Sequence, residues 1–193
     1  MRKSTVVILA ALVAVLTGAG VVTALEVRGG DRQRERVTAV LRQTLPPGST
    51  IAGVDPHGRP FLLAARQDSV SSAYAEVSAP GGQPVRMFLR EITPSTQKIG
   101  GAAGFVTLSL PEPVAPVTEP DGSSTDRGRY RDAEVRYTAG LHGDLLQVSA
   151  SDPAAPVPAA MQVALLPGLQ PVGVHVTDRG VMVVLDTDSP PWR

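Results

Sequence analysis

Apolar and polar positions change their period near Gly53, which separates a helical part of the chain from a strand-forming part. Residues 31–45 repeat apolar side chains at helical spacing, at Val37, Val40, Leu41 and Leu45. The pattern predicts a helix that Asp31 caps at its start and that Pro46-Pro47-Gly48 ends.

Beyond Gly53 the apolar residues alternate with polar ones, which is the pattern of half-buried strands. The strands that this alternation predicts cover residues 69–79, 84–92, 103–110, 130–138, 144–150, 161–166, 172–177 and 181–187. The last two form a hairpin around Thr177-Asp178-Arg179-Gly180. One helix and eight short strands predict an α+β domain built on an antiparallel sheet.

Two proline-rich stretches interrupt the predicted strands. Pro111 to Arg129 contains four prolines and no regular period, so it predicts a long exposed loop. Residues 151–158 predict a shorter extended connector. The alternation resumes after each stretch without a change in composition, so residues 28–193 are expected to form one domain.

An uncharged run from Thr5 to Leu25 follows Arg2 and Lys3 at the N-terminus. A run of about 20 apolar residues can cross a bilayer as a helix. The small residues toward its end, Val22-Thr23-Ala24 among them, equally fit a secretory signal with a cleavage site. Residues 1–27 are therefore expected to be either a cleaved signal peptide or a transmembrane anchor.

Arginines lie just past this run and outnumber the basic residues before it, at Arg28, Arg32, Arg34, Arg36 and Arg42. By the positive-inside rule alone, they favour a folded part in the cytoplasm. The signal-like end of the run, together with the family resemblance described below, favours export instead. The arginines are expected to form a solvated helix face or, beside a retained anchor, to lie close to lipid headgroups.

Composition and motifs argue against several classes of function. The 18 acidic and 18 basic residues cancel, which argues against a nucleic-acid partner. Cysteine is absent, and the three histidines, His57, His142 and His175, have no metal-ligand spacing. The chain contains no serine-nucleophile or phosphate-loop motif. The sequence therefore predicts a protein that is not an enzyme and that uses no metal or cofactor.

Several predicted strands are apolar on both faces. Residues 181–186 place valine and leucine on one side and methionine and valine on the other, and residues 161–166 are similar. Both faces of the sheet must then leave water, and one helix cannot cover both. The second face either packs on another layer of sheet, in a core filled by its own side chains, or lines an apolar cavity.

A short turn, HGRPFLL at residues 57–63, places large apolar side chains directly after two residues that break regular structure. Gly58 permits a sharp approach, and Pro60 fixes the backbone as in the first turn of a helix. The side chains expected to point inward together are Phe61, Leu62 and Leu63. The turn is thus expected to be a lid or end plug of the apolar interior.

The order of a basic helix, a Gly-x-Pro-Phe-Leu turn and an antiparallel sheet resembles the LmeA-like phospholipid-binding family of actinobacterial cell-envelope proteins. Residues 166–186 also look like the closing segment and final hairpin of that family. The central strands match in pattern only, and the proline-rich loop 111–129 looks like an insertion. Residues 63–68 depart from the polar pair and glycine that usually follow in the family. The turn residues that carry the resemblance are Gly58, Pro60, Phe61 and Leu62.

The resemblance implies a fold like that of the tubular lipid-binding proteins. In that fold a curved antiparallel sheet wraps around a long helix and leaves an apolar channel for acyl chains; here an N-terminal hydrophobic helix would precede it. It also implies phospholipid as the ligand, export to the cell envelope, and a role in lipid transport or in lipoglycan and envelope maintenance without chemistry. The residues expected to contact acyl chains are Phe61, Leu62, Leu63, Met87, Leu89, Val106, Leu108, Val183 and Leu185.

The main alternative is a membrane-anchored envelope domain with a filled core that binds a protein or glycan partner. Unfilled volume between the two-sided strands would distinguish the lipid-binding domain from this alternative. A hydrolase acting on lipid is disfavoured by the missing nucleophile motif.

Overall fold

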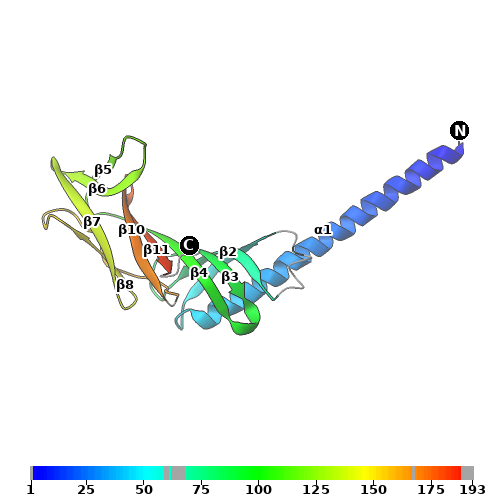
Figure 1. Cartoon of the computed structure of the whole chain (residues 1–193), viewed down its shortest axis with the longest axis horizontal. Coiled ribbons are helices and arrows are strands. Elements are labelled where there is room, and N and C mark those ends of the chain that lie inside the picture. The colour runs from blue at the N-terminus through cyan, green and yellow to red at the C-terminus, as the bar shows by residue number, and fades with distance from the viewer. Residues whose placement is uncertain (1, 59–60, 62–67, 167, 188–193) are drawn as a thin grey trace.

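The protein is an α+β chain with one long helix and two antiparallel sheets (Figure 1). The computed structural model describes the backbone of residues 2–58, 61, 68–166 and 168–187, and the side chains of these ranges from residue 21 onward. The predicted class and the predicted antiparallel pairing are confirmed, while a second sheet joins the one that the resemblance implies.

Helix α1 (Arg2–Thr44) runs without interruption. The prediction that Asp31 caps the start of a separate helix is therefore wrong, because the chain is already helical before it. The predicted stop at Pro46-Pro47-Gly48 is confirmed, since α1 ends just before the prolines and Gly48 has φ +84°. Figure 1 shows the N-terminal half of α1 extending away from the sheets.

Most of the predicted membrane segment, residues 1–27, precedes residue 21, the first residue whose side chain is described. Within the part of the chain that is described, no helical stretch is long and apolar enough to cross a bilayer.

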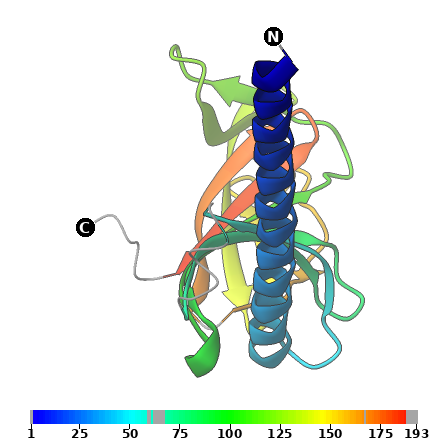
Figure 2. The same cartoon turned by 90° about the vertical axis from the view of Figure 1, so that its right-hand side faces the viewer.

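The larger sheet has six strands in the order β1-β2-β3-β4-β11-β10, and every neighbouring pair is antiparallel. Helix α1 contacts β1 and β2 and crosses in front of the strands in Figure 2. The short helix η1 (Pro94–Thr96) joins β3 to β4. The strand bounds are β1 (Thr50–His57), β2 (Val70–Ser78), β3 (Val85–Thr93), β4 (Lys98–Leu108), β10 (Leu169–Thr177) and β11 (Gly180–Thr187).

The smaller sheet has five strands in the order β5-β6-β7-β8-β9. Strand β10 of the larger sheet lies against β5, β6 and β7, which joins the two sheets into one body. The strand bounds are β5 (Ala115–Thr118), β6 (Ser124–Tyr130), β7 (Ala133–His142), β8 (Leu145–Ala150) and β9 (Met161–Gln162).

The proline-rich stretch 111–129 is not a plain loop, which corrects the sequence prediction. It forms β5 and most of β6, an exposed hairpin at the edge of the smaller sheet. An edge strand tolerates proline because one side of its backbone needs no ladder partner, and Pro116 lies in β5 opposite Gly128. Arg127 fixes the hairpin by pairing with Glu119 and, at 3.1 Å, with Glu134.

Strand β1 was also missed from the sequence, because Gly53 and Pro56 interrupt its pattern. The register against β2 shifts between Ile51 and Gly53, as in a β-bulge. Like β5, β1 is an edge strand, so it accommodates Pro56.

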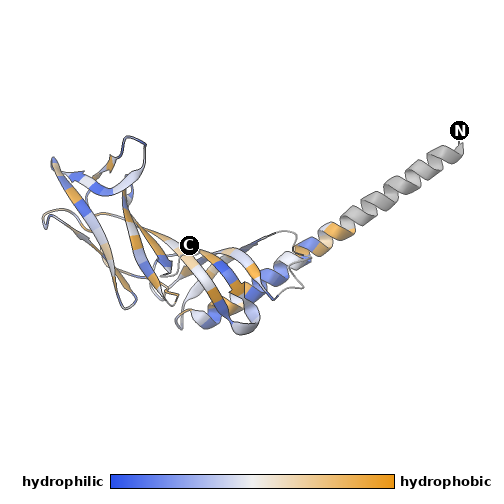
Figure 3. Cartoon of the chain, in the orientation of Figure 1, coloured by the Kyte–Doolittle hydropathy of each residue, from blue (hydrophilic) through white to orange (hydrophobic). Residues whose placement is uncertain are grey.

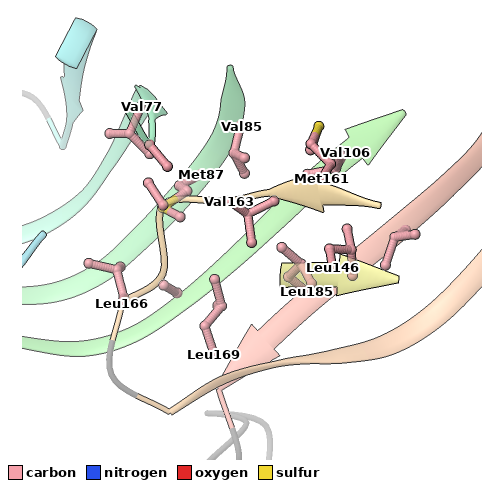
Figure 4. Packing of buried hydrophobic residues seen from close by; sticks show 14 of the residues in the cluster. Val77, Val85, Met87, Val106, Leu146, Met161, Val163, Leu166, Leu169 and Leu185 are labelled. Atoms are coloured by element: carbon pink, nitrogen blue, oxygen red, sulfur yellow. The ribbon is translucent and has the colours of Figure 1, made fainter. Parts of the chain in front are cut away.

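One apolar core joins α1 and both sheets. Buried side chains come from the C-terminal part of α1 and from both sheets. Figure 3 shows hydrophobic residues alternating with hydrophilic ones along the strands, and Figure 4 shows part of the buried cluster. The Tyr137 hydroxyl, at the centre of the smaller sheet, donates to the Pro156 carbonyl at 3.1 Å. Burial, reinforced by the nearby Tyr130, raises the pKa of Tyr137. The connector 151–158 is thus held against this core.

Candidate functional site

The strand residues expected to contact acyl chains lie together on the core face of the larger sheet. β3, β4 and β11 are neighbours, and Val183 lies directly opposite Val106 in the register. All six side chains are at most 4 % exposed and belong to one cluster: Met87, Leu89, Val106, Leu108, Val183 and Leu185. The structure therefore brings these predicted residues together, on a continuous apolar face.

An irregular segment after β9, residues 163–166, crosses over this face and is called the crossover here. Figure 4 shows Val163 of the crossover beside Met87 of β3, and Leu166 further along the same segment. Val163 is fully buried and Leu166 is 4 % exposed. A Cβ atom on Gly82, just before β3, would lie only 2.3 Å from the carbonyl oxygen of Gln162. The close approach of Gln162 to this loop therefore requires glycine at position 82. Packed side chains thus fill the space over Met87 in this conformation.

Phe61 packs on α1 rather than in the shared core. It is 8 % exposed but is not a member of the core cluster. A Cβ on Gly29 would lie 3.0 Å from the Phe61 Cβ and 3.2 Å from its carbonyl carbon, and a Cβ on Gly30 would lie 3.3 Å from its ring. The Phe61 amide donates to Glu26 Oε1 at 2.6 Å. The glycine pair thus forms a seat on α1 for Phe61.

The turn before Phe61 depends on Gly58. Its φ is +109°, and a side chain at this position would begin 2.6 Å from Ser71 Oγ. Phe61 was predicted to point into the apolar interior; its side chain is buried, but against α1 and outside the core cluster. Pro60, Leu62 and Leu63 lie outside the described residues, so their predicted roles stay predictions.

A groove of about 650 Å³ lies between α1 and the end of β1, and Phe61 is part of its wall. Its size falls within the range of small-molecule sites. Exposed apolar side chains of α1 border it, and Val22 and Val27 are 57 % and 60 % exposed. The remaining lining residues are Thr23, Glu26, Gly30, Asp31, Arg34, Asp55, Pro56, His57 and Gly58.

The charged residues of the groove are partly paired with one another. Arg34 binds Asp31 at 3.1 Å through Nη1 and the Val54 carbonyl at 2.9 Å through Nε. These contacts hold α1 along the edge strand β1. The groove is therefore amphipathic: valine, proline and phenylalanine side chains lie beside carboxylates and one arginine.

Aromatic side chains gather on the opposite face of the larger sheet. Tyr74 lies 5.0 Å from Phe88 and 4.9 Å from His57, centroid to centroid. Tyr74 is 51 % exposed and Phe105 is 48 % exposed, and both line a second hollow of about 650 Å³ with Phe88 and Arg86. The alternation within residues 84–92 puts Phe88 and Arg86 on the face opposite Met87, but nothing in that local pattern indicates that other strands add aromatic residues beside them.

The glycine-rich residues 100–104 are explained by packing. A Cβ on Gly101 would lie 3.2 Å from Arg90 Nε, so glycine lets the Arg90 side chain cross β4. Arg90 then reaches Asp186 on β11 at 3.1 Å. This stretch ties β3 to β11 across β4.

Sequence reasoning missed the α1 side of the site. Glu26, Gly29 and Gly30 fell at the expected boundary between the membrane segment and the basic helix, where glycines indicate a linker. Paired glycines inside an uninterrupted helix instead indicate a close contact, as here with Phe61.

Among the described residues, no three histidine or acidic side chains lie together as a metal site would require. Comparisons of the chain with protein-family models, with curated proteins and with solved structures gave no match. The site therefore has to be interpreted from its own geometry.

The seat for Phe61 predicts an effect of unusual sign for Gly29→Ala. Alanine favours a helix interior over glycine by about 1 kcal/mol. At Gly29, however, the added methyl would press on the Phe61 backbone. We expect Gly29→Ala to lower the free energy of unfolding by about 1–3 kcal/mol, as overpacking does.

Urea unfolding followed by circular dichroism measures this change. Gly140→Ala is the control, because a Cβ at Gly140 has open space around it. A Gly29→Ala protein more stable than the wild type would show that Phe61 does not need the seat.

Proposed function

We propose that this protein is a non-enzymatic phospholipid-binding protein of the cell envelope that holds acyl chains in its apolar interior. The observation that carries the proposal is the position of Phe61: it is buried on α1, forms a wall of the groove and lies outside the core cluster. A side chain placed in this way can act as an end plug between the groove and the apolar face of the larger sheet.

The exposed apolar side chains beside the groove support entry of the ligand from a lipid bilayer. Val21, Val22, Leu25 and Val27 are each at least 42 % exposed, and they lie at the C-terminal end of the predicted membrane segment, residues 1–27. Burying an acyl chain contributes about 0.8 kcal/mol per CH₂ group. Ten buried methylenes would then contribute roughly 8 kcal/mol before ordering costs are subtracted.

An apolar channel requires that the crossover moves. The crossover, residues 163–166, has no strand partner, and its buried side chains hold it in place. We propose that an acyl chain takes the place of crossover side chains such as Val163 and Leu166. Met87, Val183 and their neighbours would then line the channel.

The lipid itself can be tested with a fragment of residues 21–193, which retains Glu26 and the glycine seat. After cooperative unfolding has shown that the fragment is folded, native mass spectrometry without detergent should show adducts of phospholipid mass. Organic extraction of the same sample should release the same lipid. A folded fragment that carries no lipid and takes none from vesicles would contradict the proposal.

We also propose that the folded part lies outside the cytoplasm. A reporter that is active only after export, fused after residue 193 of the full chain, should be active, because the end of the apolar run resembles an export signal. Activity of a reporter that works only in the cytoplasm would instead place the folded part there, as the arginines after the apolar run and the positive-inside rule favour.

A second candidate function, a domain that binds an envelope protein or glycan, is favoured by one observation. Tyr74 and Phe105 are about half exposed on the outer face of the larger sheet, and exposed aromatic side chains are typical of interfaces. This candidate predicts that the double variant Tyr74→Ser with Phe105→Ser loses binding of the envelope protein or glycan, while the lipid content of the 21–193 fragment is unchanged. Loss of lipid in that double variant would link the aromatic face to the lipid site instead.

A further inference from the structure

Gln33 is a polar side chain buried on the inner face of α1. It is 2 % exposed, and within the described residues neither its Nε2 nor its Oε1 atom has a hydrogen-bond partner. A buried amide without a partner is costly and calls for an explanation, because native proteins pair such groups almost without exception.

Helical geometry places Gln33 between the Phe61 seat and the core. It follows Gly29 and Gly30 by four and three residues and precedes Val37 by four, so all four lie on one face of α1. Gly29 and Gly30 contact Phe61, and Val37 is fully buried in the core cluster. The orphan amide therefore lies one helical turn beyond the side chain proposed as the end plug.

We propose that Gln33 is the polar contact for the glycerol end of one bound lipid, whose acyl chain runs from there into the core and whose headgroup lies on the Phe61 side. The inference rests on the proposed function and specifies its ligand. The Nε2 group would donate to an ester carbonyl, and Oε1 would accept from a hydroxyl on the same molecule. A monoacyl glycerophospholipid offers a carbonyl and a neighbouring hydroxyl, whereas the glycerol of a diacyl phospholipid offers carbonyls only.

Two features of the site agree with a ligand of one chain. The groove that Phe61 borders has about 650 Å³, within the range of sites for small molecules. The crossover covers the apolar face of β3, with Val163 beside Met87, so the space that a ligand can gain is limited by what Val163 and Leu166 give up. Gln33 therefore selects for the free hydroxyl, and the apolar face selects for a single chain.

The experiment uses the full chain in vesicles of phosphatidylcholine that contain a trace of photoreactive lipid. One probe is lysophosphatidylcholine with a diazirine on its acyl chain, and the other is diacyl phosphatidylcholine with the same group. The yield of crosslinks to residues 45–193 is measured by mass spectrometry, so contacts of lipid with α1 itself are not counted. The variants are Gln33→Met, Gln33→Leu as a second apolar replacement, and Gln43→Met as the control at an exposed glutamine of α1.

The proposal predicts more crosslinks from the monoacyl probe than from the diacyl probe in the wild type. Gln33→Met and Gln33→Leu should lower the monoacyl yield about tenfold at limiting probe, since two hydrogen bonds to the ligand are lost. Both variants should also unfold at a higher temperature, because no unpaired amide stays buried. Gln43→Met should change neither quantity.

Three results would overturn the proposal. Higher thermal stability with unchanged crosslinking would show that the Gln33 amide is only a structural orphan. Equal yields from the two probes in the wild type, insensitive to Gln33, would leave phospholipid binding in place and remove the role of Gln33. Crosslinks absent from residues 45–193 with both probes would remove this proposal and the proposed function together.

Discussion

Phe61→Asp should lower the free energy of unfolding by several kcal/mol and abolish lipid binding. The substitution removes an aromatic ring from the glycine seat and places a carboxylate where Phe61 is 8 % exposed. A buried carboxylate without a partner is costly. Glu26 adds to the cost, because its Oε1 already lies 2.6 Å from the amide of residue 61 and the two charges would repel each other.

Phe61→Leu is the matched control, since it keeps an apolar side chain on the glycine seat. We expect it to cost roughly 1 kcal/mol, the range of hydrophobic exchanges of similar volume, and to retain lipid. Unfolding is measured with urea, and lipid by native mass spectrometry of the 21–193 fragment. A Phe61→Asp protein that stays folded and carries lipid normally would show that the turn is peripheral to the site.

Arg90→Met should have an effect of similar size for a different reason. The side chains of Arg90 and Asp186 are only 9 % and 18 % exposed, and they meet at 3.1 Å across β4. Removing the arginine leaves the Asp186 carboxylate partly buried, and within the described residues it keeps the amide of Thr187 as its donor, at 2.8 Å. Breaking a buried ion pair in this way costs about 3–5 kcal/mol.

The double variant Arg90→Met with Asp186→Leu tests this explanation. Replacing both partners of a buried pair by apolar residues is often neutral, so the double variant should recover most of the lost stability in urea unfolding. A double variant as unstable as Arg90→Met alone would show that the loss comes from packing of the Arg90 side chain over Gly101 and not from the unpaired charge.

The strand alternation predicted most of the larger sheet. Residues 84–92 and 181–187 were predicted as strands and are β3 and β11, with ends shifted by at most one residue. Their apolar faces were also predicted correctly, because a period of two fixes which side of a strand Met87 and Val183 occupy. These strands are regular and buried, so local pattern and tertiary structure agree.

Two edge strands, β1 and β5, were not predicted, because their sequences break the rules that central strands obey. Pro56 in β1 and Pro116 in β5 suppress a strand signal, yet each lies at the edge of a sheet. Which strands form an edge depends on pairing between distant segments. Local patterns carry no information on that pairing.

The two sides of the candidate site lie far apart in sequence. Phe61 and the glycine before it indicated an apolar contact, but its partner is 35 residues earlier, at Glu26. Adjacent glycines such as Gly29 and Gly30 are also typical of linkers. Only the structure, in which α1 continues through them, shows that they form a seat for Phe61. Gln33 likewise carries no local signal of burial, because glutamine is common on exposed helix faces.

The most direct test of acyl-chain binding in the core is a crystal structure of the 21–193 fragment purified without detergent. Lipid binding predicts elongated electron density along the core face of the larger sheet, beside Met87 and Val183, with the side chains of the crossover displaced from it. The density should reach α1 near Phe61. Crystals whose extracts contain phospholipid, but in which the crossover still covers the core face, would contradict acyl-chain binding in the core.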